Sequence, residues 1–387
     1  MMRIVELDVD DVVLCLCCPI CVVVASFLLP STSRRFLFRM GNDDIHNESK
    51  SPRASSPDVR LTNVTKLEWT SRAHEIQAGL MDTFLNLECV DNNLYLAKHL
   101  LKGRKSSSAV YGGQVIGQAL AAAAATVGEG FIPNSLHSYF IQTGDVNRPI
   151  LYMIERVRDG RSFCTRIVKA VQQGQAIFTM QMSFHKPEPD GITHQMDMPE
   201  VPPPEELQDA RQLMESALED DSLPPASRLM LTFKLNEIPP AFERVFQFRP
   251  VDADKYTMRD GADDHPRSAL WLKANENIGD DPRLHQCVAA YISDITLIET
   301  AMRPACSKGF IPSMALSLDH TMWMHDSNFR VDEWMLYENT STISRGGRSF
   351  IEGRLWTRDG RLILSCCQEG LIRAPRQRSR SGSKSKH

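Results

Sequence analysis

Apolar residues recur at helical spacing along residues 287–302, CVAAYISDITLIETAM, and predict one helix there. Steps of three and four positions place six of them on a single face: Cys287, Ala290, Tyr291, Leu297, Ile298 and Ala301. Asp294 lies on the same face, in the middle of the stripe. Because burying a carboxylate costs several kcal/mol unless it is paired or hydrogen-bonded, this aspartate needs either a partner or a function.

Strand-like alternation occurs in two stretches that repeat one another. One begins at Arg158 (RDGRSFCTRIVKAVQQGQAIFTMQMSF) and the other at Arg345 (RGGRSFIEGRLWTRDGRLILSCCQEGLI). Each reads Arg-x-Gly-Arg-Ser-Phe, then an alternating strand, a polar turn with glycine and a second long strand. The two stretches therefore predict two similar antiparallel hairpins.

The elements before each hairpin indicate an internal duplication. The helical sequence GGQVIGQALAAAAATV precedes the strand SLHSYFI in the first copy, and AAYISDITLIETAM precedes SLDHTMWMH in the second. Gly112 lies 25 residues before His137, and Asp294 lies 25 residues before Asp319. Since an alanine-rich helix is stabilised when a sheet wraps around it, we expect an α+β double hotdog. In this fold two tandem antiparallel sheets each wrap around a long central helix.

The same pattern divides the chain into parts. The ordered part is expected to consist of a first hotdog at 76–190, a proline-rich and helical linker at 191–235, and a second hotdog at 236–375 that carries the catalytic residues. Strand-like sequence resumes near residue 236. Residues 1–75 read as an N-terminal extension that ends in a polar linker, and the basic, Ser/Gly-rich residues 376–387 read as a disordered tail.

Composition excludes some classes of protein. Of 387 residues, 24% are charged and the formal net charge is -4, which gives no indication of nucleic-acid binding. There are ten cysteines, four of them between residues 15 and 21. Because the body of the chain has no paired CxxC motif and no Cys/His ligand spacing, we expect no metal site, and the scattered cysteines suit a reducing compartment.

The N-terminal segment 12–29, VVLCLCCPICVVVASFLL, is free of charge and long enough to span a bilayer. Acidic residues precede it and Arg34, Arg35 and Arg39 follow it, so an inserted segment would keep the downstream chain cytosolic. The alternative is an extension of the gene model that the mature protein lacks. Both interpretations stay open at this stage.

Several motifs carry a family resemblance. They are VYGGQVIGQAL, LHSYFIQTGD, HQMDMPEVPPPEEL, CVAAYISD, SLDHTMWMH, WMLYE and GRLWTRDGRLILSCCQEGLIR. From about residue 80 to 375 the chain resembles the acyl-CoA thioesterase II (TesB-like) family, and most of all its animal peroxisomal members. The resemblance implies hydrolysis of fatty acyl-CoA to free fatty acid and CoA, without metal, cofactor or covalent intermediate. It also implies a catalytic trio, which falls here on Asp294, Ser317 and Gln368.

The residues themselves agree with this trio. Gln368 shares strand parity with Leu364 and Cys366, so it too is a polar group on an apolar face. A carboxylate, a hydroxyl and an amide that meet in a buried site could orient one water, and Asp294 would take its proton. The helical sequence that begins at Gly112 contains no acid, so we expect a single catalytic set.

Nucleophilic catalysis is disfavoured. The sequence has no GxSxG motif, which excludes a nucleophile elbow of that type. On a regular strand Ser317 and Asp319 would point to one side and His320 to the other, so these residues should not form a triad. We expect His137 and His320 to be structural histidines.

Gly112 and Gly113 are weaker candidates for an oxyanion or substrate site, because glycines let backbone N–H groups approach a ligand at a helix start. The alternative, which stays open, is a turn or tight packing. Arg161 and Arg348 pose a similar choice between CoA phosphates and a structural role.

The expected partners are the acyl-CoA substrate and, by family analogy, a second copy of the chain in a homo-oligomer. Resemblance implies a peroxisomal location and an import receptor, but the tail Ser385-Lys386-His387 differs from the Ser-Lys-Leu signal at its last position. Cytosolic location, or anchoring through residues 12–29, is the alternative.

The competing functions are a catalytically silent acyl-CoA-binding sensor and a membrane-tethered scaffold. The acyl chain length depends on the depth of a tunnel that no linear pattern reveals.

Overall fold

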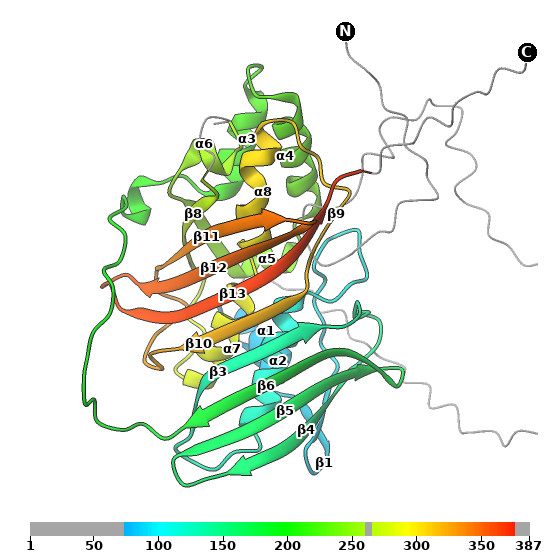
Figure 1. Cartoon of the computed structure of the whole chain (residues 1–387), viewed down its shortest axis with the longest axis vertical. Coiled ribbons are helices and arrows are strands. Elements are labelled where there is room, and N and C mark those ends of the chain that lie inside the picture. Colours follow the sequence, from blue (N-terminus) through cyan, green and yellow to red (C-terminus); the bar gives the residue numbers. More distant parts are fainter. Residues whose placement is uncertain (1–72, 260–264, 376–387) are drawn as a thin grey trace, which may run out of the picture.

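A computed structural model of the protein describes residues 73–259 and 265–375. The hydrophobic segment 12–29, the polar residues after it and the tail 376–387 lie outside the described residues. Figure 1 shows two stacked halves, each with strands on one side and helices on the other.

The first half confirms the predicted helix followed by antiparallel strands. Its elements are α1 (Ala73–Phe84), β1 (Glu88–Asp91), β2 (Leu94–Ala97), α2 (Gly112–Ala124), β3 (Ile132–Phe140), β4 (Ile150–Asp159), β5 (Phe163–Gln172) and β6 (Gln175–His185). The predicted polar turn lies between β5 and β6. Its two residues, Gln173 and Gly174, have φ values of 51° and 75°, which match the right-handed twist of a two-residue hairpin.

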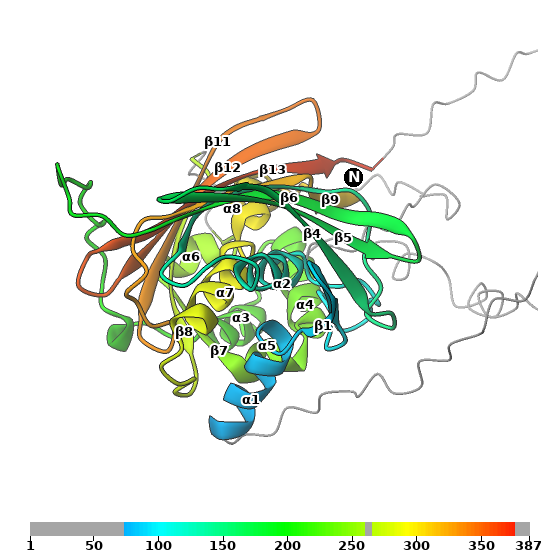
Figure 2. The same ribbon diagram turned by 90° about the horizontal axis from the view of Figure 1, so that it is seen from below.

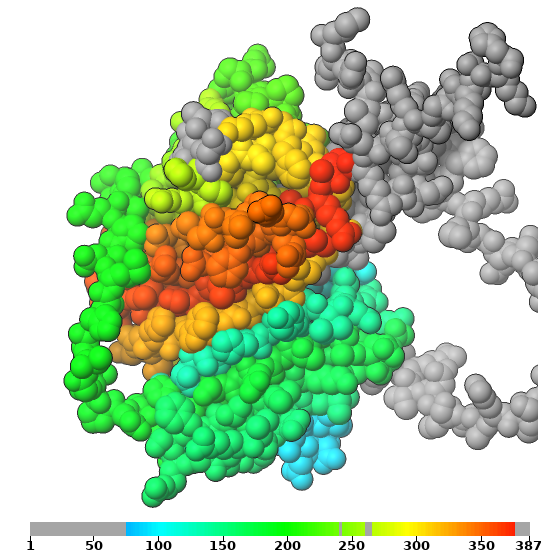
Figure 3. Space-filling model, viewed as in Figure 1, coloured from blue at the N-terminus to red at the C-terminus, as the bar shows by residue number. Residues whose placement is uncertain are grey.

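The connection to the second half runs along one side of the molecule in the space-filling view (Figure 3). Its side chains attach it to the second half: Gln195 donates to the carbonyl of Gly360 at 2.7 Å and accepts from the N–H of Leu362 at 3.1 Å. Four short helices follow: η2 (Pro204–Glu206), α3 (Ala210–Glu219), α4 (Pro225–Glu237) and α5 (Pro240–Val245). The prediction that strand resumes near residue 236 is wrong, because a proline at the first position of α5 starts another helix.

The second half repeats the plan of the first. Its elements are β7 (Phe246–Pro250), α6 (Ala253–Tyr256), β8 (Arg267–Ala274), α7 (Pro282–Ser293), α8 (Leu297–Ser307), β9 (Met314–Ser317), β10 (Asp319–Met324), β11 (Met335–Arg345), β12 (Arg348–Thr357) and β13 (Leu362–Arg373). The second predicted hairpin is β12–β13, whose turn contains Gly360 at φ 87°.

The single helix expected over residues 287–302 is wrong. The structure breaks it into α7 and α8, and Asp294 is the residue that ends α7, with φ −89° and ψ 0°. Two side chains of β11 hold the break open. The Tyr337 hydroxyl donates to the carbonyl of Ser293, and the Asn339 amide donates to the Thr296 hydroxyl. The Ser293 carbonyl therefore has a partner from outside the helix.

The two expected sheets are joined into one. Strand β3 of the first half pairs antiparallel with β10 of the second, giving a 13-stranded sheet in the order β1-β2-β4-β5-β6-β3-β10-β13-β12-β11-β8-β7, with β9 beside β13. Seen from below, this sheet arches over α2 and α7 (Figure 2). The double hotdog is confirmed, with the correction that its two sheets are continuous.

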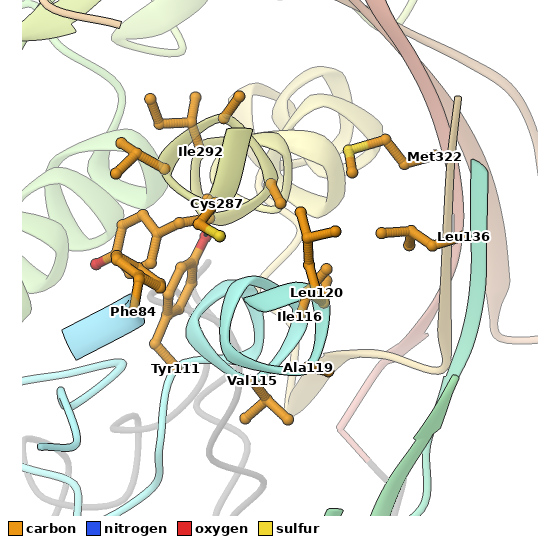
Figure 4. Close-up of a cluster of buried hydrophobic side chains, with 14 of the residues drawn as sticks. Phe84, Tyr111, Val115, Ile116, Ala119, Leu120, Leu136, Cys287, Ile292 and Met322 are labelled. Atoms are coloured by element: carbon orange, nitrogen blue, oxygen red, sulfur yellow. Dashed lines mark hydrogen bonds between the residues drawn. The ribbon is translucent and has the colours of Figure 1, made fainter. Parts of the chain in front are cut away.

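The core is centred on a close contact between α2 and α7. A Cβ atom on Gly113 would lie 2.4 Å from the carbonyl oxygen of Tyr291, so glycine is what allows the two backbones to approach. Figure 4 shows apolar side chains between the helices and two that point in from the sheet, Leu136 and Met322. These two lie opposite one another in the β3–β10 register, so the junction of the halves also faces the core.

The helix contact can be tested with Gly113→Ala. We expect this change to lower the free energy of unfolding by about 1–3 kcal/mol, because the new methyl group must displace the backbone of α7. The matched control is Gly191→Ala, where nothing lies within 4 Å of an added Cβ. Chemical denaturation of both variants measures the difference. Equal midpoints for the two variants would show that the helices do not need a glycine here.

Candidate active site

Asp294 lies between the two halves, at the end of α7 and against the first turn of α2. A Cβ on Gly112 would lie 2.8 Å from Asp294 Oδ2 and 3.0 Å from Cε1 of Phe140. Asp294 keeps some solvent exposure, yet protein atoms surround its carboxylate closely. This desolvation raises the pKa of Asp294 to about 7, against opposing hydrogen bonds from the Ser317 hydroxyl, the Gly113 N–H and the Gln368 amide.

The structure brings the three predicted residues together. Gln368 Nε2 donates to Ser317 Oγ at 2.7 Å, and Ser317 Oγ donates to Asp294 Oδ1 at 3.4 Å. Ser317 is 6% exposed and Gln368 is 1% exposed, so bulk solvent has little access to their polar atoms and they bond mainly to protein partners. The 3.4 Å contact is long for a hydroxyl donor, as catalytic hydrogen bonds often are in the absence of substrate.

A fourth residue, His320, belongs to the same group. Its Nδ1 lies 2.8 Å from Gln368 Oε1 and its Nε2 lies 2.9 Å from Ser293 Oγ. The imidazole is fully buried, and burial lowers the pKa of His320 to about 4, so it is neutral at pH 7. It therefore carries one proton, which one of these two hydrogen bonds must use.

The expectation that His320 points away from Ser317 is wrong. Ser317 pairs with Gly370 and Thr321 pairs with Cys367, so one extra residue lies on this side of the ladder, at the bend of Leu318. A one-residue bulge reverses the alternation and turns both side chains inward. His320 lies two positions before the buried Met322 on the same strand. This shared strand parity was the sequence signal that could have placed the His320 side chain inside.

The first turn of α2 lies beside the site, but its role differs from the simplest expectation. The N–H of Gly113 hydrogen-bonds to the Asp294 carboxylate, and Gly112 gives that carboxylate the space to approach. Both glycines thus serve close packing as well as the site, and an oxyanion role for them stays a prediction. Arg348 pairs with Glu369 at 3.1 Å on the exposed face of the sheet.

Within residues 73–259 and 265–375, no three His, Cys, Asp or Glu side chains are grouped so that they could hold a metal ion. Over the same two ranges, each helix is too short or too polar to cross a bilayer.

Comparison with known proteins agrees with the fold and the site. Two family models match, "Acyl-CoA thioesterase N-terminal domain" over residues 102–185 and "Acyl-CoA thioesterase C-terminal domain" over residues 204–372. The solved acyl-CoA thioesterase II TesB2 of Mycobacterium marinum is 33% identical, with a TM-score of 0.58, over 76% of this chain and 98% of that one. The protein is thus a thioesterase of the double hotdog class.

Relatives with similar sequences identify the family more narrowly. Acyl-coenzyme A thioesterase 8 of Mus musculus is 42% identical over 309 residues, which cover 79% of this chain and 93% of the relative. The peroxisomal acyl-coenzyme A thioester hydrolase 1 of Saccharomyces cerevisiae is 25% identical, over 78% of this chain and 96% of the relative. The chain belongs to the acyl-CoA thioesterase family.

The raised pKa of Asp294 predicts a stability effect. A carboxyl group whose pKa is higher in the folded state stabilises the fold when protonated, and this stabilisation is lost as the pH rises from about 4 to about 7. We expect Asp294→Asn to raise the thermal midpoint by at least about 2 °C at pH 8.5 and by less at pH 5. Calorimetry at both pH values tests this. A difference that does not change with pH would contradict the assigned cause.

Proposed function

We propose that this protein hydrolyses fatty acyl-CoA to free fatty acid and CoA, with Asp294 as the general base for a water molecule. The observation that carries the proposal is a single carboxylate, with a pKa of about 7, in contact with a buried hydroxyl–amide pair. A base with a pKa near the working pH is efficient because it is largely ionised and still accepts a proton readily. Family membership supports the substrate class.

We infer the steps from the contacts among these three residues. Ser317 and Gln368 hold the water beside Asp294, which takes one of its protons as the water oxygen attacks the thioester carbonyl carbon. The positive end of the α2 dipole lies near this point and favours the negative charge that develops. The intermediate then collapses, the C–S bond breaks, and the proton on Asp294 passes to the CoA sulfur. No covalent enzyme intermediate forms.

An apolar cavity of about 190 Å³ supports a fatty acyl substrate. Tyr291 and Ile295, on either side of Asp294 in the chain, both line it. Its other walls include aromatic side chains (Tyr111, Phe242, Phe246, Phe248 and Tyr256) and, at its polar parts, charged ones such as Lys234 and Glu299. Ligand pockets of this kind take apolar groups, so we place the acyl chain here, with the thioester toward Asp294.

The base assignment is tested with full-length protein and Asp294→Asn, by release of free CoA thiol from acetyl-, octanoyl- and palmitoyl-CoA. We expect the variant to lose at least about 100-fold in kcat, the usual contribution of a general base. For the wild type, kcat/KM should rise with pH and level off above about 7, where Asp294 is ionised. Octanoyl-CoA should be preferred to acetyl-CoA, because the cavity offers apolar walls to its longer chain.

The matched control is Asp319→Asn, another partly buried aspartate whose Oδ1 accepts from the N–H of Glu369 at 2.7 Å. Its asparagine can still accept that bond, so its activity should stay close to that of the wild type. If wild type and Asp294→Asn both bind acyl-CoA and neither turns it over, the protein is a sensor and the proposal fails.

We further propose a peroxisomal location, which the name of the yeast relative supports. The tail Ser385-Lys386-His387 keeps two positions of the Ser-Lys-Leu signal and departs from it at the last. Immunostaining of the untagged chain in cells should overlap a peroxisomal marker, and deletion of the last three residues should abolish the overlap. The control is deletion of residues 12–29, which should leave the location unchanged. Loss of membrane association in that control alone would instead indicate an anchor.

The formation of a homo-oligomer stays a prediction.

A further inference from the structure

We propose that His320 is a positioning residue for this reaction: its Nδ1–H holds the Gln368 amide in the orientation that lets it donate to Ser317. The inference rests on the proposed function of the same site. His320 is not a catalytic residue, because Gln368 and Ser317 stand between it and Asp294.

The evidence is a chain of hydrogen bonds through five residues, two at the end of α7 and one each on β9, β10 and β13. Ser293 Oγ lies 2.9 Å from His320 Nε2. The other ring nitrogen, His320 Nδ1, lies 2.8 Å from Gln368 Oε1. Gln368 Nε2 in turn lies 2.7 Å from Ser317 Oγ, and Ser317 Oγ lies 3.4 Å from Asp294 Oδ1. The two ends of this chain, Ser293 and Asp294, are neighbours in sequence. The network is therefore a ring closed by the backbone at the end of α7.

The direction of these bonds matters because an amide can face either way. With Nε2 toward Ser317, the amide donates to the hydroxyl, whose own proton is free for Asp294. A flipped amide would present Oε1 to Ser317 and draw that proton away from the carboxylate. Only a histidine that is protonated on Nδ1 donates to Oε1 and so opposes the flip.

A competing arrangement exists at the far end of the ring. Ser293 Oγ also lies 2.8 Å from the carbonyl oxygen of Ala290, and its single proton can satisfy only one acceptor fully. If it goes to Ala290, His320 can donate from Nε2, and the amide is then free to flip. An ionised Asp294 is the strongest acceptor in the ring, and it favours the arrangement in which Ser317 donates to Asp294 and the Gln368 amide donates to Ser317. The neutral, buried imidazole keeps that direction fixed while substrate binds.

The test is a double-mutant cycle of His320→Leu and Gln368→Ala, with octanoyl-CoA hydrolysis by the full chain. We expect His320→Leu to lower kcat about tenfold or more, the effect of losing a hydrogen bond in the transition state, with KM changed less than about twofold. In the Gln368→Ala background the same change should have no further effect, because His320 acts through Gln368. His320→Asn, whose amide can replace the Nδ1 donor, should recover most of the rate.

The control is His325→Leu. His325 also bonds a serine hydroxyl, Ser365, at 2.9 Å, but it is exposed and lies outside the ring, so its removal should leave kcat unchanged. Histidine-selective ¹⁵N NMR of the wild type gives a second readout that does not depend on activity. It should show a neutral, Nδ1-protonated His320 between pH 6 and 8, with the signal assigned by its loss in His320→Asn.

Several results would overturn the inference. They are multiplicative losses of rate in the double variant, an unchanged kcat in His320→Leu, or an Nε2-protonated or charged imidazole. If Asp294→Asn is inactive while His320→Leu keeps the wild-type kcat, only the positioning role fails. If the wild type hydrolyses no acyl-CoA, the proposed function fails and the positioning role with it.

Discussion

The backbones of α2 and α7 touch at the centre of the molecule, and the other parts are arranged around that contact. Added Cβ atoms on Gly113 and Gly117 would lie 2.4 and 2.9 Å from backbone carbonyl oxygens of α7. Larger side chains at these two positions would hold the helices further apart and move the start of α2 away from Asp294. The close approach lets the first half hydrogen-bond a carboxylate that belongs to the second half. Each half is therefore needed for one site.

The site is costly to the fold, and its neighbours show how that cost is offset. Desolvation outweighs three hydrogen bonds at Asp294, so its pKa is raised rather than lowered. Interrupting a helix after Ser293 also leaves backbone groups without helical partners, and Tyr337 takes up one of them. Every polar side chain in the ring from Ser293 to Asp294 has a partner, which is the condition under which a buried polar network is tolerated.

Sequence patterns predicted the faces of the elements better than their hydrogen-bond register. The hydrophobic period and the repeated motifs predicted the duplication and the two hairpins. Asp294 and Gln368 were identified as candidate site residues because each is polar on an apolar face. The break after Ser293 was missed because apolar spacing continues across it, and nothing local shows that Tyr337 competes for a carbonyl. The bulge at Leu318 was missed because one extra residue leaves no trace in composition, yet it moves His320 into the site. The β3–β10 pairing joins strands far apart in sequence, which local periodicity does not report.

The duplication also explains why Asp294 has no acidic counterpart at the matching position of the first copy. The equal spacing of 25 residues matches Gly112 in the first copy with Asp294 in the second, and these two positions are in contact, since a Cβ on Gly112 would lie 2.8 Å from Asp294 Oδ2. A symmetric molecule would bring two carboxylates to that distance, where like charges prevent both from being ionised. Any side chain at Gly112 would also occupy the place of the Asp294 carboxylate. The contact that completes the site thus requires one copy to keep the acid and the other to have no side chain.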